Sequence, residues 1–445
     1  MRSIKILAPL FLCPLFVFAQ RYAQEQVKED LKYLIKQIET YNPALYAYNQ
    51  DFSKKAGEVV NSVNGELSTF EVFRKVAEIA TLSNEGHFGL GVWEDEAHEG
   101  ILNNKFKYMP LAPIVNDGKI YVWDTFLDGN SLERGDEILE INGKTTKGIL
   151  EILNRHTPAD GGILTYKQVQ LSKGFPWMYF LFVEQPESFK IKLKKRSTGQ
   201  IESAQCNAAT ILERNAKRKE EPTHKKEGKE QVYEFKLVNG YGLLTLKTFN
   251  RGLLEKYEIE ADELYEGIFK ELEESGAEHL IVDLRDNNGG RNEFYEDMLP
   301  YLTDKKGVFK TSISWKGKEK KHKYPSTSKY AFQGKTYVLI NGGKFSSASV
   351  LARFFKEYTN ATLIGEEAGG RYEGFAGGSA EYIFLPNSKY RVTIPRYHAV
   401  FHDGEKQTTN NRGALPDYEV IPSMDALINE RDVVMEKALE LLASN

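Results

Sequence analysis

The chain has 445 residues, of which 41% are hydrophobic and 27% are charged. This composition excludes a disordered polymer and a polytopic membrane protein, and the length predicts about two to four domains. With 59 Lys and Arg against 63 Asp and Glu, the net charge is −4. Nucleic acid is therefore not expected as a partner, because no surplus of positive charge would neutralise phosphates. The 2 cysteines are too few for a disulfide framework or a cysteine-based zinc site.

The N-terminus has the order of a secretory signal peptide. Arg2 and Lys5 precede an apolar stretch, and Ala19 supplies a small residue at the cleavage point. We therefore expect residues 1–19 to be removed, and the mature chain to be secreted or periplasmic without a transmembrane segment. A retained N-terminal anchor or a lipid-modified Cys13 is the alternative.

Helical periodicity characterises residues 20–104, which we expect to form a helical N-terminal region. Apolar residues recur at helical spacing over 25–41, and a second helix is predicted over 69–82. The second helix leads into a polar turn and an alternating, strand-like segment at 83–90. This arrangement brings His87 to the edge of a strand.

Short strands are predicted between residues 105 and 212, at 120–123, 137–141 and 189–193. The string at 132–143 contains Gly-Asp, an apolar strand and Asn-Gly, and it resembles the PDZ domain; a generic hairpin is the alternative. PDZ-like domains bind extended peptides by adding them to a sheet as a strand. Residues 213–231 mix both charge signs without a buried face, which predicts a solvated linker or hairpin tip.

Strands and helices alternate over residues 232–445. Strands are predicted at 241–246, 280–284, 336–340 and 361–364, a polar hairpin at 308–322, and helices at 255–274, 292–302, 346–358 and 424–442. This alternation indicates an α/β domain whose central strands are buried on both faces. The whole chain is thus predicted to be an α/β, or α+β, multidomain protein.

Two loops follow buried strands, at the position where α/β sheets bind ligands. The loop at 283–290 reads Asp-Leu-Arg-Asp-Asn-Asn-Gly-Gly, and its paired glycines allow backbone amides to point into a site. The loop at 338–349 places several serines at the start of a helix. Serines there are usually helix caps, but a serine on a sharp strand-to-helix turn is also how hydrolases expose a nucleophile.

Together these loops resemble the tail-specific, or C-terminal processing, serine peptidases, a family that includes the tricorn core protease. Two further family motifs follow in order, Ile-Gly-Glu-Glu-Ala-Gly-Gly at 364–370 and Gly-Ala-Leu-Pro-Asp at 413–417. The resemblance covers about residues 233–422, and the PDZ-like stretch lies where the family has its PDZ domain. It implies a crotonase-like ββα catalytic domain over 232–445, protein or peptide substrates, and no cofactor or metal.

The resemblance assigns the nucleophile to Ser346, with the adjacent Ser347 as the competing choice. The amides of Ser347, Gly289 and Gly290 would then bind the oxyanion of the tetrahedral intermediate. The lysine that serves as base in the processing peptidases aligns with Arg371. A guanidinium stays protonated and cannot take the serine proton, so we expect Arg371 to orient other groups or to contact substrate.

The tricorn-like branch uses a histidine that precedes the PDZ-like domain, and this position matches His87. Its imidazole suits a general base because its pKa lies near the operating pH. His398 and His402 are alternative bases. The branch's acid before the closing motif is absent here, so Asn410 or Asn411 would orient the histidine without a charge. Further candidates for this third member are Glu85, Glu366 and Glu367.

These observations predict a secreted or periplasmic serine peptidase. A catalytically degenerate, peptide-binding envelope protein of the same fold is the main alternative, favoured by Arg371 and by the missing acid. A carbohydrate-active enzyme that uses Glu366 and Glu367 is a weaker one, because adjacent residues at a strand end point apart.

Overall fold

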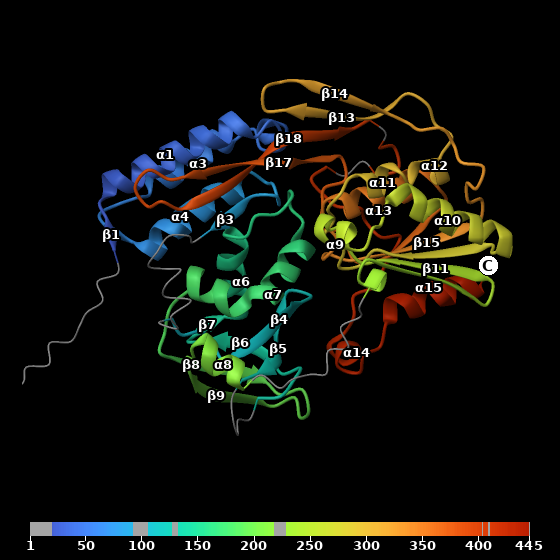
Figure 1. The fold of residues 1–445 in the computed structure, drawn as a ribbon. Helices are drawn as coiled ribbons and strands as arrows, with labels where there is room; N and C mark the ends of the chain where they lie inside the picture. Colours follow the sequence, from blue (N-terminus) through green and yellow to red (C-terminus); the bar gives the residue numbers. More distant parts are fainter. Residues whose placement is uncertain are drawn as a thin grey trace, which may run out of the picture.

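The computed structural model describes residues 20–91, 106–126, 132–217, 228–402, 404–407 and 410–444. The predicted signal peptide at 1–19 and the middle of the predicted linker lie outside the described residues. The described part is a mixed α/β protein with several sheets, arranged as a helical region, a small antiparallel sheet and a larger α/β unit (Figure 1). None of its helices combines the length and the apolar character needed to cross a membrane.

The N-terminal region is helical, as predicted. It contains β1 (Arg21–Tyr22), α1 (Gln24–Tyr41), α2 (Leu45–Tyr48), α3 (Phe52–Asn61), β2 (Leu67–Ser68), α4 (Thr69–Leu82) and β3 (Gly89–Gly91). The two predicted helices are confirmed as α1 and α4, whereas α3 was not predicted. A capping box starts α4, in which the Ser68 amide donates to the Glu71 carboxylate at 2.8 Å. His87 lies in the turn between α4 and β3.

The next region is an antiparallel sheet with the strand order β4-β5-β6-β8-β9 and two main helices. Its elements are β4 (Leu111–Asn116), β5 (Lys119–Thr125), β6 (Glu137–Ile141), β7 (Lys144–Thr145), α6 (Thr146–Arg155), α7 (Leu164–Phe182), β8 (Ser188–Lys194), β9 (Ile201–Asn207) and α8 (Ile211–Ala216). The three predicted strands are confirmed as β5, β6 and β8. The core of this sheet is continuous with that of the N-terminal helices.

The larger unit is built on a sheet with the order β10-β11-β12-β15-β16-β19, parallel except for β10. Its strands are β10 (Tyr233–Val238), β11 (Tyr241–Leu246), β12 (His279–Asp283), β15 (Lys335–Ile340), β16 (Thr362–Gly365) and β19 (Tyr418–Glu419). Helices α10 (Ala261–Ser275) and α13 (Ser347–Tyr358) cover one face, and α15 (Val433–Ala443) covers the other (Figure 1). The central strands β12 and β15 are buried on both faces, as predicted.

Three predicted helices are each divided in two, so their predicted extents were wrong. The pairs are α9 (Arg251–Lys256) with α10, α11 (Glu293–Glu296) with α12 (Leu299–Leu302), and α14 (Met424–Ile428) with α15. Glu258 and Glu430 have φ of 50° and 53°, a left-handed conformation that interrupts a right-handed helix. Pro300 lies in the first turn of α12, where a proline can start a helix but not continue one.

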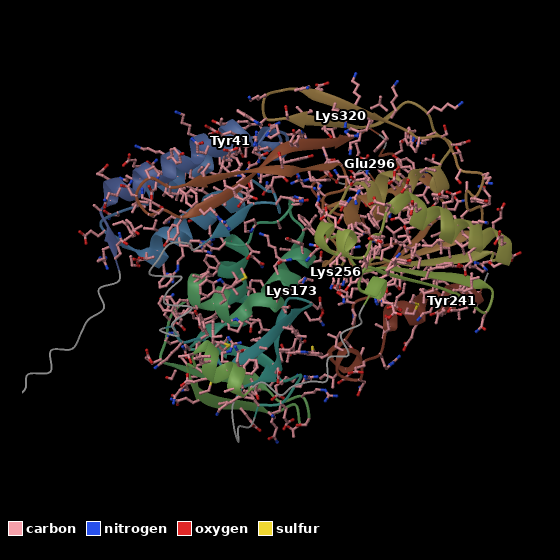
Figure 2. The ribbon with its side chains drawn as sticks, in the orientation of Figure 1. Tyr41, Lys173, Tyr241, Lys256, Glu296 and Lys320 are labelled. Carbon is pink, nitrogen blue, oxygen red and sulfur yellow. The ribbon has the colours of Figure 1, made fainter. Side chains whose placement is uncertain are left out.

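A long hairpin that was not predicted connects the regions. It consists of β17 (Gly374–Phe384) and β18 (Arg391–Phe401), in a sheet with the order β14-β13-β18-β17 that includes β13 (Val308–Ser314) and β14 (Glu319–Lys323); β3 pairs with β18. Ile383 and Val392 pack in the N-terminal core, whereas Phe375 and Phe401 pack in the core of the larger unit. Lysines such as Lys320 project from the exposed edge strand β14, which protects that edge from pairing with other chains (Figure 2).

Asp30 on α1 fastens the N-terminal helices to this hairpin. Its carboxylate is 1% exposed and accepts the amides of Asn387 and Ser388 at 2.7 and 2.8 Å. Asp30→Ala should lower the free energy of unfolding by about 2–4 kcal/mol, because the buried Ser388 amide and the half-buried Asn387 amide both lose their acceptor. Urea denaturation would measure this change. The exposed Asp51→Ala should change stability by less than about 1 kcal/mol, and equal effects of the two variants would contradict the assignment.

Candidate active site

Ser346 lies on the sharp turn between strand β15 and helix α13. Its φ of 53° and ψ of −132° are unusual for a residue with a side chain, and such strain is concentrated at functional sites. Gly289 makes room for the turn, since a Cβ there would lie 2.9 Å from the Ser346 Cβ. Ser346 is partly exposed, whereas Ser347 is fully buried and its Oγ accepts the Gly290 amide at 2.8 Å. Of the two serines, Ser346 presents its hydroxyl.

His87 meets this hydroxyl from the other side of the site. Its Nε2 lies 3.0 Å from the Ser346 Oγ, so the two residues that the sequence nominated as base and nucleophile are brought together. The imidazole packs between Phe345 and Phe375, with ring centroids at 4.6 and 5.3 Å. Burial lowers the pKa of His87, which keeps the ring neutral and Nε2 able to accept a proton near neutral pH.

The other ring nitrogen, Nδ1, is buried and has no hydrogen-bond partner among the described residues. Neither Asn410 nor Asn411 therefore orients the imidazole by a hydrogen bond. Asn410 lies in an exposed turn, and the Asn411 amide donates to Glu373 at 2.7 Å. Glu367 is likewise engaged elsewhere, in an ion pair with Arg412 at 2.6 Å. The described part of the chain thus holds a dyad without a directly bonded third member.

The alternative histidines do not contact Ser346. His398 Nε2 lies 2.9 Å from the Tyr48 hydroxyl, and His402 Nε2 lies 2.7 Å from the Thr311 hydroxyl. Burial, with the charge of Arg371, lowers the pKa of His398 to about 4. Their positions favour His87 over both as the base.

The three predicted oxyanion donors differ in whether their amides already have a hydrogen-bond acceptor in the structure. The Gly289 amide donates to Asn287 Oδ1 at 2.9 Å, and the Gly290 amide donates to Ser347 Oγ. The Ser347 amide has no acceptor among the described residues. Of the three predicted donors, the Ser347 amide at the start of α13 is the one free to bind an oxyanion as the site stands.

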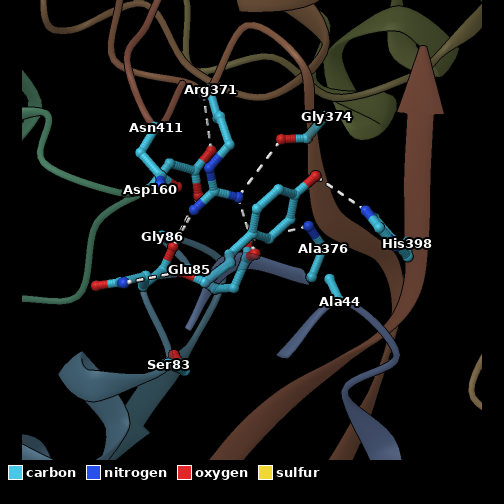
Figure 3. A network of polar contacts seen from close by, with 12 residues as sticks. Ala44, Ser83, Glu85, Gly86, Asp160, Arg371, Gly374, Ala376, His398 and Asn411 are labelled. Atoms are coloured by element: carbon cyan, nitrogen blue, oxygen red, sulfur yellow. Dashed lines mark hydrogen bonds and ion pairs between the residues drawn. The ribbon is translucent and has the colours of Figure 1, made fainter. Parts of the chain in front are cut away.

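Arg371 is 2% exposed, and its guanidinium lies 2.9 Å from the buried Glu85 carboxylate (Figure 3). The expectation that it contacts substrate does not fit this burial. Glu85, a candidate third member, faces Arg371 and the Ala376 amide rather than the imidazole.

Two residues near the dyad were missed by sequence reasoning. Asp160 accepts the Gly86 amide at 2.7 Å, although nothing in its local sequence links it to the site. Lys344, two positions before Ser346, is fully buried, and its Nζ has no partner among the described residues. Burial lowers the pKa of Lys344 well below its usual value, but the hydrogen-bond partner of Ser346 Oγ is His87. Within the described ranges, no three His, Cys, Asp or Glu residues form a group that could hold a metal ion.

Comparisons with known proteins relate this chain to a family of peptidases. Residues 240–420 match the model of Peptidase family S41. The Carboxy-terminal processing protease CtpA of Bacillus subtilis is 30% identical over 205 residues, which cover 44% of this chain and 40% of that protein. The chloroplastic Carboxyl-terminal-processing peptidase 1 of Arabidopsis thaliana is 24% identical over 379 residues, 83% of this chain and 64% of that protein. The chain thus spans less than two thirds of these relatives.

A solved structure of mature CPAF complexed with lactacystin has the same fold. It superposes with a TM-score of 0.66 at 13% identity, covering 94% of this chain and 98% of that one. The likeness extends over the N-terminal helices and the antiparallel sheet as well as the larger unit.

The histidines give a prediction that needs no substrate. In an NMR pH titration, His398 should titrate near pH 4 and His87 below its ordinary value of about 6.5, because desolvation disfavours the charged form of both imidazoles. The variants His87→Gln and His398→Gln would assign the two signals. Titration of His398 at or above pH 6.5 would contradict the buried environment described for it.

Proposed function

We propose that this chain, a member of peptidase family S41, is a serine peptidase that hydrolyses protein or peptide substrates with Ser346 as nucleophile and His87 as general base. The observation that carries the proposal is the 3.0 Å hydrogen bond between His87 Nε2 and the strained, partly exposed Ser346 hydroxyl. Nucleophile and base within hydrogen-bond reach are the signature of nucleophilic catalysis.

In the proposed mechanism, Ser346 Oγ attacks the scissile carbonyl while its proton passes to His87 Nε2. The proton then moves to the leaving amine as the peptide C–N bond breaks, and an acyl-enzyme remains on Ser346. Water activated by the same imidazole hydrolyses that ester and restores the serine. The histidine therefore alternates between base and acid in each half of the reaction.

The Ser347 amide is the proposed first oxyanion donor, since it lies at the start of α13 and has no acceptor within the described residues. The Gly290 amide becomes a second donor if the Ser347 hydroxyl rotates away from it, because that hydroxyl is its present acceptor. The Gly289 amide would need the Asn287 side chain to release it.

An apolar cavity of about 340 Å³ supports a peptide substrate. It is lined by Gly86 and Phe88, on both sides of His87, and by aromatic side chains that include Tyr166 and Trp177. The cavity thus lies along the segment that carries His87, where a substrate side chain could be held.

We also propose a finer division of the chain. We assign residues 105–212 as a PDZ-like domain, 213–231 as the linker and 232–445 as a crotonase-like catalytic domain of the tricorn-like branch. The antiparallel sheet with its two helices and the mainly parallel sheet support these assignments. The order of charged, apolar and small residues over 1–19 supports export from the cytoplasm.

A fluorophosphonate probe tests the proposed nucleophile. The full chain should be labelled on Ser346, Ser346→Ala should not be labelled, and Ser347→Ala should still be labelled on Ser346. Peptide mapping by mass spectrometry would locate the label. Wild-type protein that stays unlabelled, or labelling that survives in Ser346→Ala, would rule out the assignment.

The proposed base, His87, predicts how the peptidase activity depends on pH. The value of kcat/KM should fall as the pH drops through the pKa of His87, because only the neutral imidazole accepts the serine proton. Since burial lowers that pKa, the fall should lie below about pH 6.5. His87→Ala should remove most of the activity while the far-UV circular dichroism spectrum stays unchanged. A midpoint above pH 6.5, or full activity in His87→Ala, would assign the base to another group.

A further inference from the structure

The turn that carries His87 is held by the side chain of Arg371. Its Nη2 donates to the Asn84 carbonyl, and its Nη1 lies 2.9 Å from Glu85 Oε1 and 3.4 Å from the Gly374 carbonyl (Figure 3). The second Glu85 oxygen accepts the Ala376 amide at 2.9 Å. One guanidinium therefore joins the segment just before His87 to the start of strand β17.

A third segment closes the arrangement. The two carboxylate oxygens of Asp160, which lies between α6 and α7, accept the Gly86 amide at 2.7 Å and the Arg371 amide at 3.0 Å. Asp160 is 1% exposed, so both hydrogen bonds are shielded from water. Asp160, from the antiparallel-sheet region, thus bonds to the N-terminal region at Gly86, the residue before His87, and to the larger unit at Arg371.

The face of the guanidinium is occupied as well. Its central carbon lies 3.5 Å from the centre of the Tyr48 ring, and the Tyr48 hydroxyl is hydrogen-bonded to His398. The side chains of Arg371 and Glu85 are both fully buried. Hydrogen bonds therefore hold the Arg371 guanidinium within its plane, and the Tyr48 ring restricts its movement out of that plane.

We propose that Arg371 is a positioning residue, which together with Glu85 and Asp160 forms a clamp that holds His87 against Ser346. The proposal rests on the proposed function, in which His87 is the base. A lysine could not make these contacts, because its ammonium is a single point of charge, whereas the guanidinium is planar, carries several donors and stacks on a ring. At the position where the processing peptidases have their catalytic lysine, this chain has a residue that aligns a different base.

The two charges of the clamp that face the imidazole act on it in opposite directions. Arg371 lowers the pKa of His87 and Asp160 raises it, while burial against Phe345 and Phe375 has the largest effect and lowers it. The two oxygens of Glu85 are engaged by Arg371 and by the Ala376 amide. Removal of either charge should therefore leave a signature that a loss of packing alone would not produce.

The test compares Arg371→Met and Asp160→Asn in the full chain. Each should lower kcat by about 10²-fold with KM within about twofold, because a base displaced by about 1 Å loses that much. The acidic limb of the pH–kcat/KM profile should move to higher pH in Arg371→Met, which removes a neighbouring positive charge. It should move to lower pH in Asp160→Asn, which removes a negative one. Arg371→Lys should not restore kcat.

Arg431→Met is the matched control, because Arg431 makes a two-bond ion pair with Glu436 on the exposed surface. It should leave kcat and the pH profile unchanged. Wild-type kcat in Arg371→Met, or the same direction of pH shift in both clamp variants, would overturn the clamp.

A second measurement does not depend on turnover, which matters if breaking the buried ion pair lowers stability. In the Ser346→Ala background, nuclear Overhauser effects between the rings of His87 and Phe345 or Phe375 should weaken in Arg371→Met and persist in Arg431→Met. Unchanged ring contacts would overturn the clamp even if the wild type shows no peptidase activity. Equal activity of wild type and Ser346→Ala would instead overturn the proposed function, so the two failures are distinguishable.

Discussion

The site depends on one hydrogen bond, between His87 and Ser346, whose residues are 259 positions apart in the sequence. The proposed nucleophile belongs to the strand-to-helix turn after β15, and the histidine belongs to the N-terminal region. Two residues after His87, strand β3 pairs with β18, from Gly89 opposite Thr393 to Gly91 opposite Arg391. Because β17 and β18 contribute to both large hydrophobic cores, the hairpin transmits the position of one region to the other. The geometry of the proposed catalytic pair is therefore a property of how the regions dock.

The turn at Ser346 is maintained by its surroundings rather than by its own preference. A side chain at positive φ costs on the order of 1–3 kcal/mol, which the well-packed neighbours on β15 and α13 can offset. Space on both sides comes from residues without a Cβ: a methyl group on Gly289 would contact the Ser346 Cβ, and one on Gly370 would contact Ser349. The strain keeps the hydroxyl pointing at His87 while Ser347 turns inward. Gly370 is required by close approach, whereas Gly289 is required both by close approach and by its φ of 82°, which disfavours any side chain.

The resemblance to the processing peptidases assigned the proposed nucleophile and base to Ser346 and His87, whose side chains lie 3.0 Å apart in the structure. Sequence patterns located the strands and the two loops, because each is encoded by a local motif or by periodicity. What they missed is set by distant contacts. Asp160 bonds residues 74 and 211 positions away, and no local pattern records such a partnership. The first part of β17 reads Gly-Phe-Ala-Gly-Gly-Ser, which resembles a loop until β18 pairs with it. The amides of Gly289 and Gly290 were predicted as oxyanion donors from the loop sequence, but in the structure they donate to the side chains of Asn287 and Ser347.

The buried pair of Glu85 and Arg371 is better explained by the specific docking it enforces than by a contribution to the free energy of folding. Removing two charges from water costs about as much as their attraction returns, so the net contribution of such a pair to folding is small. Losing one partner is different, because it leaves an unpaired buried charge and costs about 3–5 kcal/mol. Any docking of the N-terminal region that withdrew Glu85 would leave the Arg371 guanidinium with the 4.0 Å contact to Glu373 in place of its 2.9 Å ion pair, and the Asn84 carbonyl would lose its donor as well. A misplaced His87 segment thus costs more free energy than the correctly formed ion pair contributes. This difference favours the one docking in which the proposed base, which lies on a separate segment, reaches Ser346.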